Sequence, residues 1–163
     1  LSSGAVDAAE WICPAADLGA GLYQAAKYYY GPGWHEPSTL LDLSMDLASW
    51  EKLDSATQGL IDDMTKSFNM TVFSRFQAAN GPALQKLLNV HNVELKKFPD
   101  EVLIALGNAA GEVVSERGSI NSDTKGICNH LLSFRKNIMD WSTKGESEFA
   151  RIRNLSFKYP DSV

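Results

Sequence analysis

Apolar residues recur at steps of three and four along much of the chain, which is the spacing of one face of an α-helix. The longest stripe follows Asp54 or Ser55, either of which is a plausible N-cap. It predicts an amphipathic helix of more than about twenty residues, with apolar positions at Leu60, Ile61, Met64, Phe68, Val72 and Phe76. Asn-Gly-Pro at 80–82 should kink or restart this helix, because proline fits the first turn of a helix but interrupts its interior.

Two more helical regions are predicted toward the C-terminus. Residues 99–118 begin with proline followed by acidic residues and end in glycine, which are the usual start and stop signals of a helix. From residue 122 to about 150, apolar side chains alternate at steps of four and three, at Ile127, Leu131, Phe134, Ile138 and Trp141. This seam lasts about two heptads, so packing on the parent domain is favoured over a coiled coil. The segment beyond it predicts a short helix and a loose tail.

Shorter elements are predicted before and between these helices. Apolar or alternating runs predict strands at residues 5–10, 38–46 and 93–98. A short helix should start near Pro14, and residues 31–37 should form a loop because glycine and proline dominate them. A few strands among dominant helices predict a predominantly helical α/β fold. No repeat or composition boundary interrupts residues 1–163, so a single domain is expected.

Carboxylates interrupt the apolar run near the N-terminus. A strand at 5–10 would send Asp7 and Glu10 to opposite faces and would place Glu10 at its end. Glu36 lies in the loop after the following helix, so a strand–helix–loop arrangement could bring both glutamates to one pocket. Two carboxylates with backbone carbonyls suit a hard cation such as Na⁺ or Ca²⁺. Spacing alone favours the plainer interpretation that both are surface or loop acids.

The neighbours of these glutamates also have two interpretations. Trp11 and Trp34 could form the walls of a small apolar pocket, although their positions alone favour a place in the core. Asp7 is expected to be a buried structural acid. Asp17 is expected in the first turn of the short helix, where the helix dipole favours a negative charge.

Composition and charge exclude several classes of function. The formal net charge is −5 and no basic cluster occurs, which argues against nucleic-acid binding. No apolar run approaches the ~20 residues that span a bilayer. Cys13 and Cys128 lie far apart and the three histidines are scattered, so a zinc site is not indicated. Nucleophile motifs and phosphate-binding loops are missing as well, so neither an enzyme nor an organic cofactor is expected.

Several stretches in order resemble one known family. "SSGAVDAAEW", "LYQAAKYYYGPGWHEP", "STLLDLSMD" with "ASWEKL", and "VELKKFPDEVL" together resemble the C-terminal half of an extracytoplasmic solute-binding receptor. The similarity is to the 2-oxo acid and lactate-type branch of the tripartite ATP-independent periplasmic (TRAP) transporters. It covers essentially the whole chain and is most specific over residues 4–37. This resemblance favours a site shared by Glu10 and Glu36 over the interpretation that both are ordinary surface or loop acids.

The resemblance implies a site and a fold. Glu10 and Glu36 match the family's metal-binding acids, and the main-chain carbonyl of Trp11 matches a further oxygen ligand. Trp11, Trp34 and Glu36 are the positions expected to contact the bound carboxylate, with Na⁺ or Ca²⁺ bridging it to the protein. The expected fold is a partial periplasmic-binding-protein-like fold of type II with long C-terminal helices. Such a receptor transforms nothing and hands its ligand to transporter membrane subunits in the periplasm.

The chain also departs from the family pattern. Receptors of this kind are longer, and the half that precedes this sequence carries the arginine and the amide side chain expected at the site. We therefore expect an N-terminal lobe to be absent here, and a complete site not to form from this chain alone. Ala15 and Ala16 stand where the family often has larger side chains facing the cleft, which would alter selectivity.

Two functions follow from this resemblance. The first is the substrate-binding component of a TRAP-type transporter for a small 2-oxo or 2-hydroxy acid, here shortened. The alternative is a dimerising structural or interaction module, derived from such a receptor, that no longer binds ligand. Either would form a homodimer, because the family dimerises through its long C-terminal helices and a half-receptor would expose apolar surface.

Overall fold

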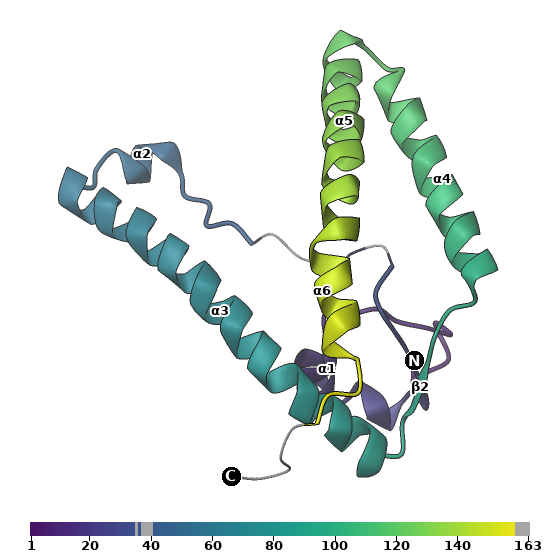
Figure 1. The fold of residues 1–163 in the computed structure, drawn as a ribbon. Coiled ribbons are helices and arrows are strands. Elements are labelled where there is room, and N and C mark those ends of the chain that lie inside the picture. Colours follow the sequence, from purple (N-terminus) through teal and green to yellow (C-terminus); the bar gives the residue numbers. More distant parts are fainter. Residues whose placement is uncertain (35, 37–40, 159–163) are drawn as a thin grey trace. The chain divides into compact units, whose positions relative to one another are not determined.

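The computed structural model describes residues 1–34, 36 and 41–158. Helices dominate these residues, together with a two-stranded sheet (Figure 1). The elements in chain order are α1 (Pro14–Ala20), the 3₁₀ turn η1 (Leu22–Gln24), β1 (Tyr28–Tyr30), α2 (Leu47–Trp50), α3 (Ser55–Asn89), β2 (Glu94–Lys96), α4 (Asp100–Gly118), α5 (Ser122–Lys144) and α6 (Glu146–Arg153).

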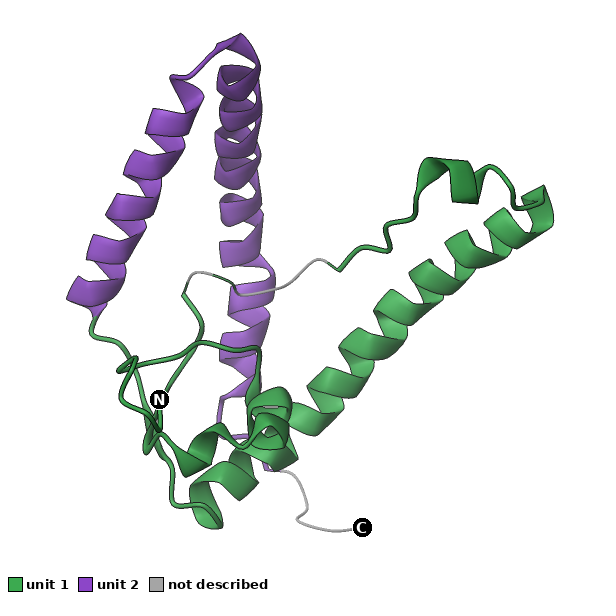
Figure 2. Ribbon diagram, turned by 180° about the vertical axis from the view of Figure 1, so that it is seen from behind, with its two compact units in different colours: residues 1–99 green, residues 100–163 purple. Residues whose placement is uncertain are grey.

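The chain divides into two compact units, Leu1–Pro99 and Asp100–Val163, which Figure 2 colours separately. The single domain expected for residues 1–163 stays a prediction, because compact units within a chain do not by themselves define domains. Within the described residues, none of the helices combines the length and apolarity that crossing a membrane requires.

The long predicted helix is confirmed as α3. Asp54 is its N-cap, and its carboxylate accepts the Thr57 N–H at 2.8 Å. Of the predicted kink or restart at 80–82, the restart is wrong, because α3 continues through Pro82 to Asn89, and the kink stays a prediction. Proline in a helix interior costs about 3 kcal/mol. Burial of Ala83 and Leu87, which closely follow it, stabilises the continuous helix.

The sheet of the first unit joins segments on either side of α3. Strand β1 pairs in parallel with β2, with Tyr28 opposite Glu94 and Tyr30 opposite Lys96. Ala83, Leu87 and Val93 form the buried apolar core, and α1 packs on α3 beside it. The Ala15 N–H donates to Asn80 Oδ1 at 3.1 Å, which attaches the start of α1 to α3. The core of this unit therefore lies where α1, the end of α3 and the start of β2 meet.

The second unit is built from consecutive helices. Helices α4 and α5 pack as an antiparallel hairpin, and Asn121 caps α5 by accepting the N–H groups of Asp123 and Thr124. Thr124 Oγ1 accepts the Asn121 N–H in return, which completes a capping box. Gly118 lies so close to α5 that a Cβ there would be 3.3 Å from Cys128 Cβ. The predicted helix at 99–118 is confirmed as α4.

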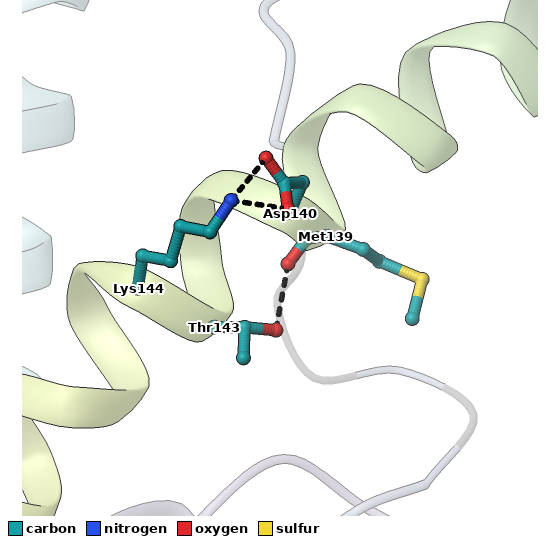
Figure 3. Close-up of polar contacts among 4 residues, drawn as sticks. All are labelled: Met139, Asp140, Thr143 and Lys144. Carbon is teal, nitrogen blue, oxygen red and sulfur yellow. Dashed lines mark hydrogen bonds and ion pairs between the residues drawn. The ribbon is translucent and has the colours of Figure 1, made fainter.

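The predicted helical region from 122 to about 150 is two helices that meet at Gly145. A Cβ at Gly145 would lie 3.2 Å from the Trp141 ring, so a larger residue at the break would require the indole to shift. In the last turn of α5, Lys144 pairs with Asp140 at 2.7 Å and the Thr143 hydroxyl donates to the Met139 carbonyl at 2.8 Å (Figure 3). A lysine in this position also interacts favourably with the negative end of the helix dipole.

The strand predictions have mixed outcomes. The strand at 93–98 is confirmed as β2, but residues 5–10 and 41–46 form no strand, and 38–40 lie outside the described residues. A strand forms only where a neighbour accepts its backbone hydrogen bonds, and β2 pairs instead with the unpredicted β1. The predicted loop is confirmed at 31–34 and 36. The other loop positions and the last five residues of the tail lie outside the described part.

Candidate functional site

The four predicted site residues lie in two irregular segments of the first unit. Glu10 and Trp11 closely precede α1, and Trp34 and Glu36 follow β1. All four are exposed, with Trp11 at 54% and Trp34 at 41% of full exposure. Neither tryptophan therefore belongs to the core, contrary to the plainer interpretation of their positions. Glu10 does not end a buried strand, but it lies at the surface, where a dissolved ion can reach it.

Asp17 is the charged residue that holds the first of these segments in place. It is buried, at 6% exposure, in the first turn of α1. Its Oδ1 accepts the Ile12 N–H at 3.3 Å, and its Oδ2 accepts the Tyr29 hydroxyl at 2.5 Å. The expectation for the two aspartates is thus half wrong. Asp17 does lie in the first helical turn, but it is the buried acid, whereas Asp7 is exposed.

Tyr29 brings the second segment to the same carboxylate. It is the central residue of β1 and is half-buried, and the loop with Trp34 and Glu36 begins where this strand ends. Burial and the hydrogen bond to Asp17 raise the pKa of the Tyr29 phenol above its usual value. The hydroxyl therefore stays protonated and remains a donor to Asp17 at neutral pH.

Ion pairs fix the position of β1 against β2. Glu94 lies 2.7 Å from Lys27 Nζ and 2.8 Å from Lys96 Nζ. Hydrogen bonds from these two ammonium groups hold the pKa of the Glu94 carboxyl down to about 2. The same lysines lie near the face of the Tyr28 ring, at 5.5 and 5.4 Å from its centroid. The three charged side chains are between 40% and 63% exposed, so they contribute to strand register more than to stability.

The loop that carries Trp34 and Glu36 begins at a fixed point of the sheet. The Gly31 N–H donates to the Lys96 carbonyl at 3.1 Å, which extends the pairing of β1 and β2 by one hydrogen bond. The Tyr30 ring stacks on Phe98 at 4.8 Å between centroids. The Gly31–Pro32 peptide bond is cis. The hydrogen bond of Gly31 and the stacking of Tyr30 on Phe98 define where the loop leaves the sheet.

The atoms available at the predicted site indicate which cation would fit there. Glu10, Glu36 and the Trp11 carbonyl supply oxygen atoms only, which suits Na⁺ or Ca²⁺ and does not suit zinc. Across the residues that the structure describes, no group of three or more His, Cys, Asp or Glu side chains could hold a metal ion. Two carboxylates and one carbonyl are fewer oxygens than Ca²⁺ usually takes. Further ligands would therefore have to come from outside this set.

Three residues of this region were not identified from the sequence. The sequence pattern gives Tyr29 no role, it includes Asn80 only in the helix-interrupting Asn-Gly-Pro at 80–82, and it predicts burial of Asp7 in place of Asp17. The first-turn position of Asp17 was a usable signal. The partner of Tyr29 lies 12 residues away and that of Asn80 lies 65 residues away, beyond the reach of helix or strand periodicity, so local patterns carried no signal for them.

Comparison with known proteins identifies the class to which this arrangement belongs. A solved TRAP transporter solute-binding protein from Bordetella bronchiseptica superposes with a TM-score of 0.82 at 29% identity over 93% of this chain. It is described as a mixed-occupancy dimer with calcium and picolinate bound in one active site. A TRAP periplasmic solute-binding protein from Pseudoalteromonas atlantica, with bound sodium and pyruvate, gives a TM-score of 0.83 at 25% identity over 96% of this chain. The chain thus has a partial periplasmic-binding-protein fold of type II, as predicted.

The sequence comparisons give the family itself. The profile of the bacterial extracellular solute-binding proteins, family 7, matches residues 1–119, and the chain belongs to this family. A monocarboxylate 2-oxoacid-binding periplasmic protein of Nostoc sp. is 32% identical over 96% of the chain. The chain spans 43% of that relative, and 45% and 46% of the two solved structures.

Proposed function

We propose that this chain is part of the substrate-binding component of a TRAP-type uptake transporter for a small 2-oxo or 2-hydroxy acid. The family and the names of its relatives, which bind 2-oxoacids, pyruvate or picolinate, support this proposal. The observation that carries it is local: one buried carboxylate, Asp17, contacts both the segment after Glu10 and the strand that leads to Glu36.

In this proposal Glu10, Glu36 and the Trp11 carbonyl are oxygen ligands of Na⁺ or Ca²⁺. The cation neutralises the two carboxylates and attracts the carboxylate of the solute, which offsets the cost of removing these charges from water. Trp11 and Trp34 present exposed rings to the apolar part of the solute, and Glu36 lies beside it. No organic cofactor is needed, because the solute is bound and released unchanged.

The same proposal assigns a location and partners. The protein acts in the periplasm, as its relatives do, and delivers its solute to the transporter membrane subunits. It is a binding protein rather than an enzyme, and it works as a homodimer.

Calorimetric titration of pyruvate or lactate in the presence of Ca²⁺ or Na⁺ tests the site. We expect Glu36→Ala to weaken solute binding at least tenfold, because even supporting residues around a metal commonly change affinity by about 10–100-fold. Glu51→Ala is the matched control, since Glu51 is an exposed glutamate in the turn after α2. Equal affinity of the two variants would exclude Glu36 as a ligand. No binding by the wild type with either cation would contradict solute binding by this chain alone and favour the alternative function described next.

The alternative function is a dimerising module that no longer binds solute. The observation in its favour is the exposure of the α5 seam, which comprises Ile127, Leu131, Phe134, Ile138 and Trp141 and is between 40% and 69% exposed. An apolar seam of this kind is normally covered by a partner. Self-association without solute binding in the titration above would support this module.

A further inference from the structure

The contact between Asp17 and Ile12 controls a peptide group that the proposed site uses. The Ile12 N–H belongs to the same planar peptide unit as the Trp11 carbonyl. That peptide bond is trans, so its N–H and C=O point in opposite directions. When Asp17 accepts the N–H at 3.3 Å, the Trp11 oxygen is therefore directed away from the Asp17 carboxylate. The hydrogen bond on the N–H side of this peptide therefore sets the direction of its carbonyl.

The hydrogen bond from Tyr29 prevents the carboxylate from turning. Asp17 has one oxygen on Ile12 and the other on Tyr29, so rotation of the carboxylate would break both contacts. The two donors come from different places: Ile12 precedes α1, and Tyr29 is the centre of β1. One side chain thus connects the segment that holds Glu10 and Trp11 to the strand that leads to Trp34.

We infer that Asp17 is a positioning residue that aims the Trp11 carbonyl at the cation and ties the two ligand-bearing segments together. The inference rests on the proposed function. A negative charge on the N–H side of a peptide also polarises its carbonyl oxygen, which makes that oxygen a stronger ligand for a cation. Asp17 thus acts through the Trp11 peptide and does not touch the cation or the solute.

A purely structural role for Asp17 would be that of a helix cap. In a capping box, an acidic side chain at the third helical position accepts the N–H of the N-cap residue. Asp17 is the fourth residue of α1, and it accepts the N–H of Ile12, which precedes the N-cap Cys13. Cys13 itself makes no side-chain cap. The second contact, with Tyr29, is not part of any cap and distinguishes the two roles.

The experiment measures two quantities separately: protection of the Ile12 amide and affinity for the cation. Asp17→Leu is compared with the wild type by amide hydrogen exchange at Ile12, and by titration with Ca²⁺ alone followed through the carbonyl ¹³C signal of Trp11. We expect exchange at Ile12 to accelerate at least tenfold and Ca²⁺ affinity to fall about 10–100-fold. Asp17→Asn should restore protection of Ile12, because its amide oxygen can accept the same N–H. It should not restore the full Ca²⁺ affinity, because the charge is lost.

Tyr29→Phe keeps the test valid if Asp17→Leu does not fold. Phenylalanine has no hydroxyl to donate, so the Asp17 carboxylate loses one of its two contacts. Amide hydrogen exchange at Ile12 should then accelerate, although the Ile12 N–H is bonded to Asp17 and not to residue 29. Unchanged exchange at Ile12 in both variants would overturn the inference. So would an unchanged Ca²⁺ affinity in Asp17→Leu when the wild type binds Ca²⁺. If the wild type does not bind Ca²⁺ while Asp17 still protects the Ile12 amide, this chain has no cation site of its own, and the role of the Trp11 carbonyl as its ligand is refuted.

Discussion

A buried carboxylate needs partners for both of its oxygens, and Asp17 has them. Among the described residues it is the buried charged side chain, and the Ile12 amide and the Tyr29 hydroxyl satisfy it. An unsatisfied buried acceptor costs about 1–3 kcal/mol, and more when it is charged. Asn80 on α3 holds the start of α1 in a similar way, because it accepts the Ala15 N–H. The placement of α1 thus depends on two polar side chains as well as on apolar packing.

The pH dependence of stability should report the contact between Tyr29 and Asp17. The pKa of Tyr29 is raised in the folded protein above the ordinary value of about 10, chiefly by burial. The stability contributed by the protonated phenol is therefore fully present below about pH 10 and is lost as the pH rises toward the folded-state pKa. We expect the free energy of unfolding of the wild type to fall more steeply above about pH 10 than that of Tyr29→Phe.

Urea unfolding followed by circular dichroism at several pH values measures this difference. Tyr28→Phe is the matched control, because it makes the same change at the exposed neighbouring position of β1. Parallel pH profiles for the wild type and Tyr29→Phe would show that the phenol is not stabilised in its neutral form.

Helices of this chain were predictable because their signals are local. The N-cap Asp54, the proline and acids at the start of α4 and the apolar stripes all lie within a few residues of the hydrogen bonds that they favour. The strand predictions were less successful because strand formation depends on a partner that lies elsewhere in the sequence. The partner of Tyr28–Tyr30 lies beyond α3, so three consecutive tyrosines carried no sign of pairing, whereas the run at 5–10 had the right composition and no paired neighbour. Pro82 predicted a restart that does not occur, because the packing around Ala83 and Leu87 outweighs the cost of a proline inside a helix.

The capping box of α5 should contribute measurably to the stability of the second unit. Asn121 accepts two backbone N–H groups at 3.0 and 2.9 Å that would otherwise lack an intrahelical partner. We expect Asn121→Ala to lower the free energy of unfolding by about 1 kcal/mol. Chemical unfolding followed by circular dichroism provides the measurement.

Asn108→Ala is the control for this cap, because Asn108 is exposed in the interior of α4. Alanine has the higher helix propensity, so this control should leave stability unchanged or slightly increase it. A loss of the same size in both variants would mean that the cap contributes nothing specific.

At the scale of the whole chain, the sequence predicted the family and a part of the site. Resemblance identified Glu10, Trp11, Trp34 and Glu36, whereas spacing alone favoured ordinary surface acids and core tryptophans. The four residues lie at the surface in two segments, and the contacts that hold these segments come from Asp17 and Tyr29. Side-chain contacts between distant segments depend on the assembled fold, which explains why they were missed. The assignment of the four residues as ligands stays a prediction.

Exposed apolar side chains on α5 predict self-association. Replacing Leu131 and Phe134 by aspartate puts two charges into the seam, and we expect this variant to be monomeric at concentrations where the wild type is dimeric. Light scattering coupled to size exclusion measures the mass. Lys136→Asp serves as the control, because this exposed residue of the same helix lies outside the seam. A wild type that is a stable monomer at micromolar concentration would contradict the homodimer.

The parallel pairing of β1 with β2 also bears on how fast each unit can form. Because the whole of α3 lies between the two strands, the chain must close a long loop before the first sheet hydrogen bond can form. Helices α4, α5 and α6, in contrast, contact their immediate neighbours in sequence. Folding rates fall as contacts become more distant along the chain. We therefore expect the C-terminal helices to acquire their structure early and the segments that carry the proposed ligands to reach their final positions later.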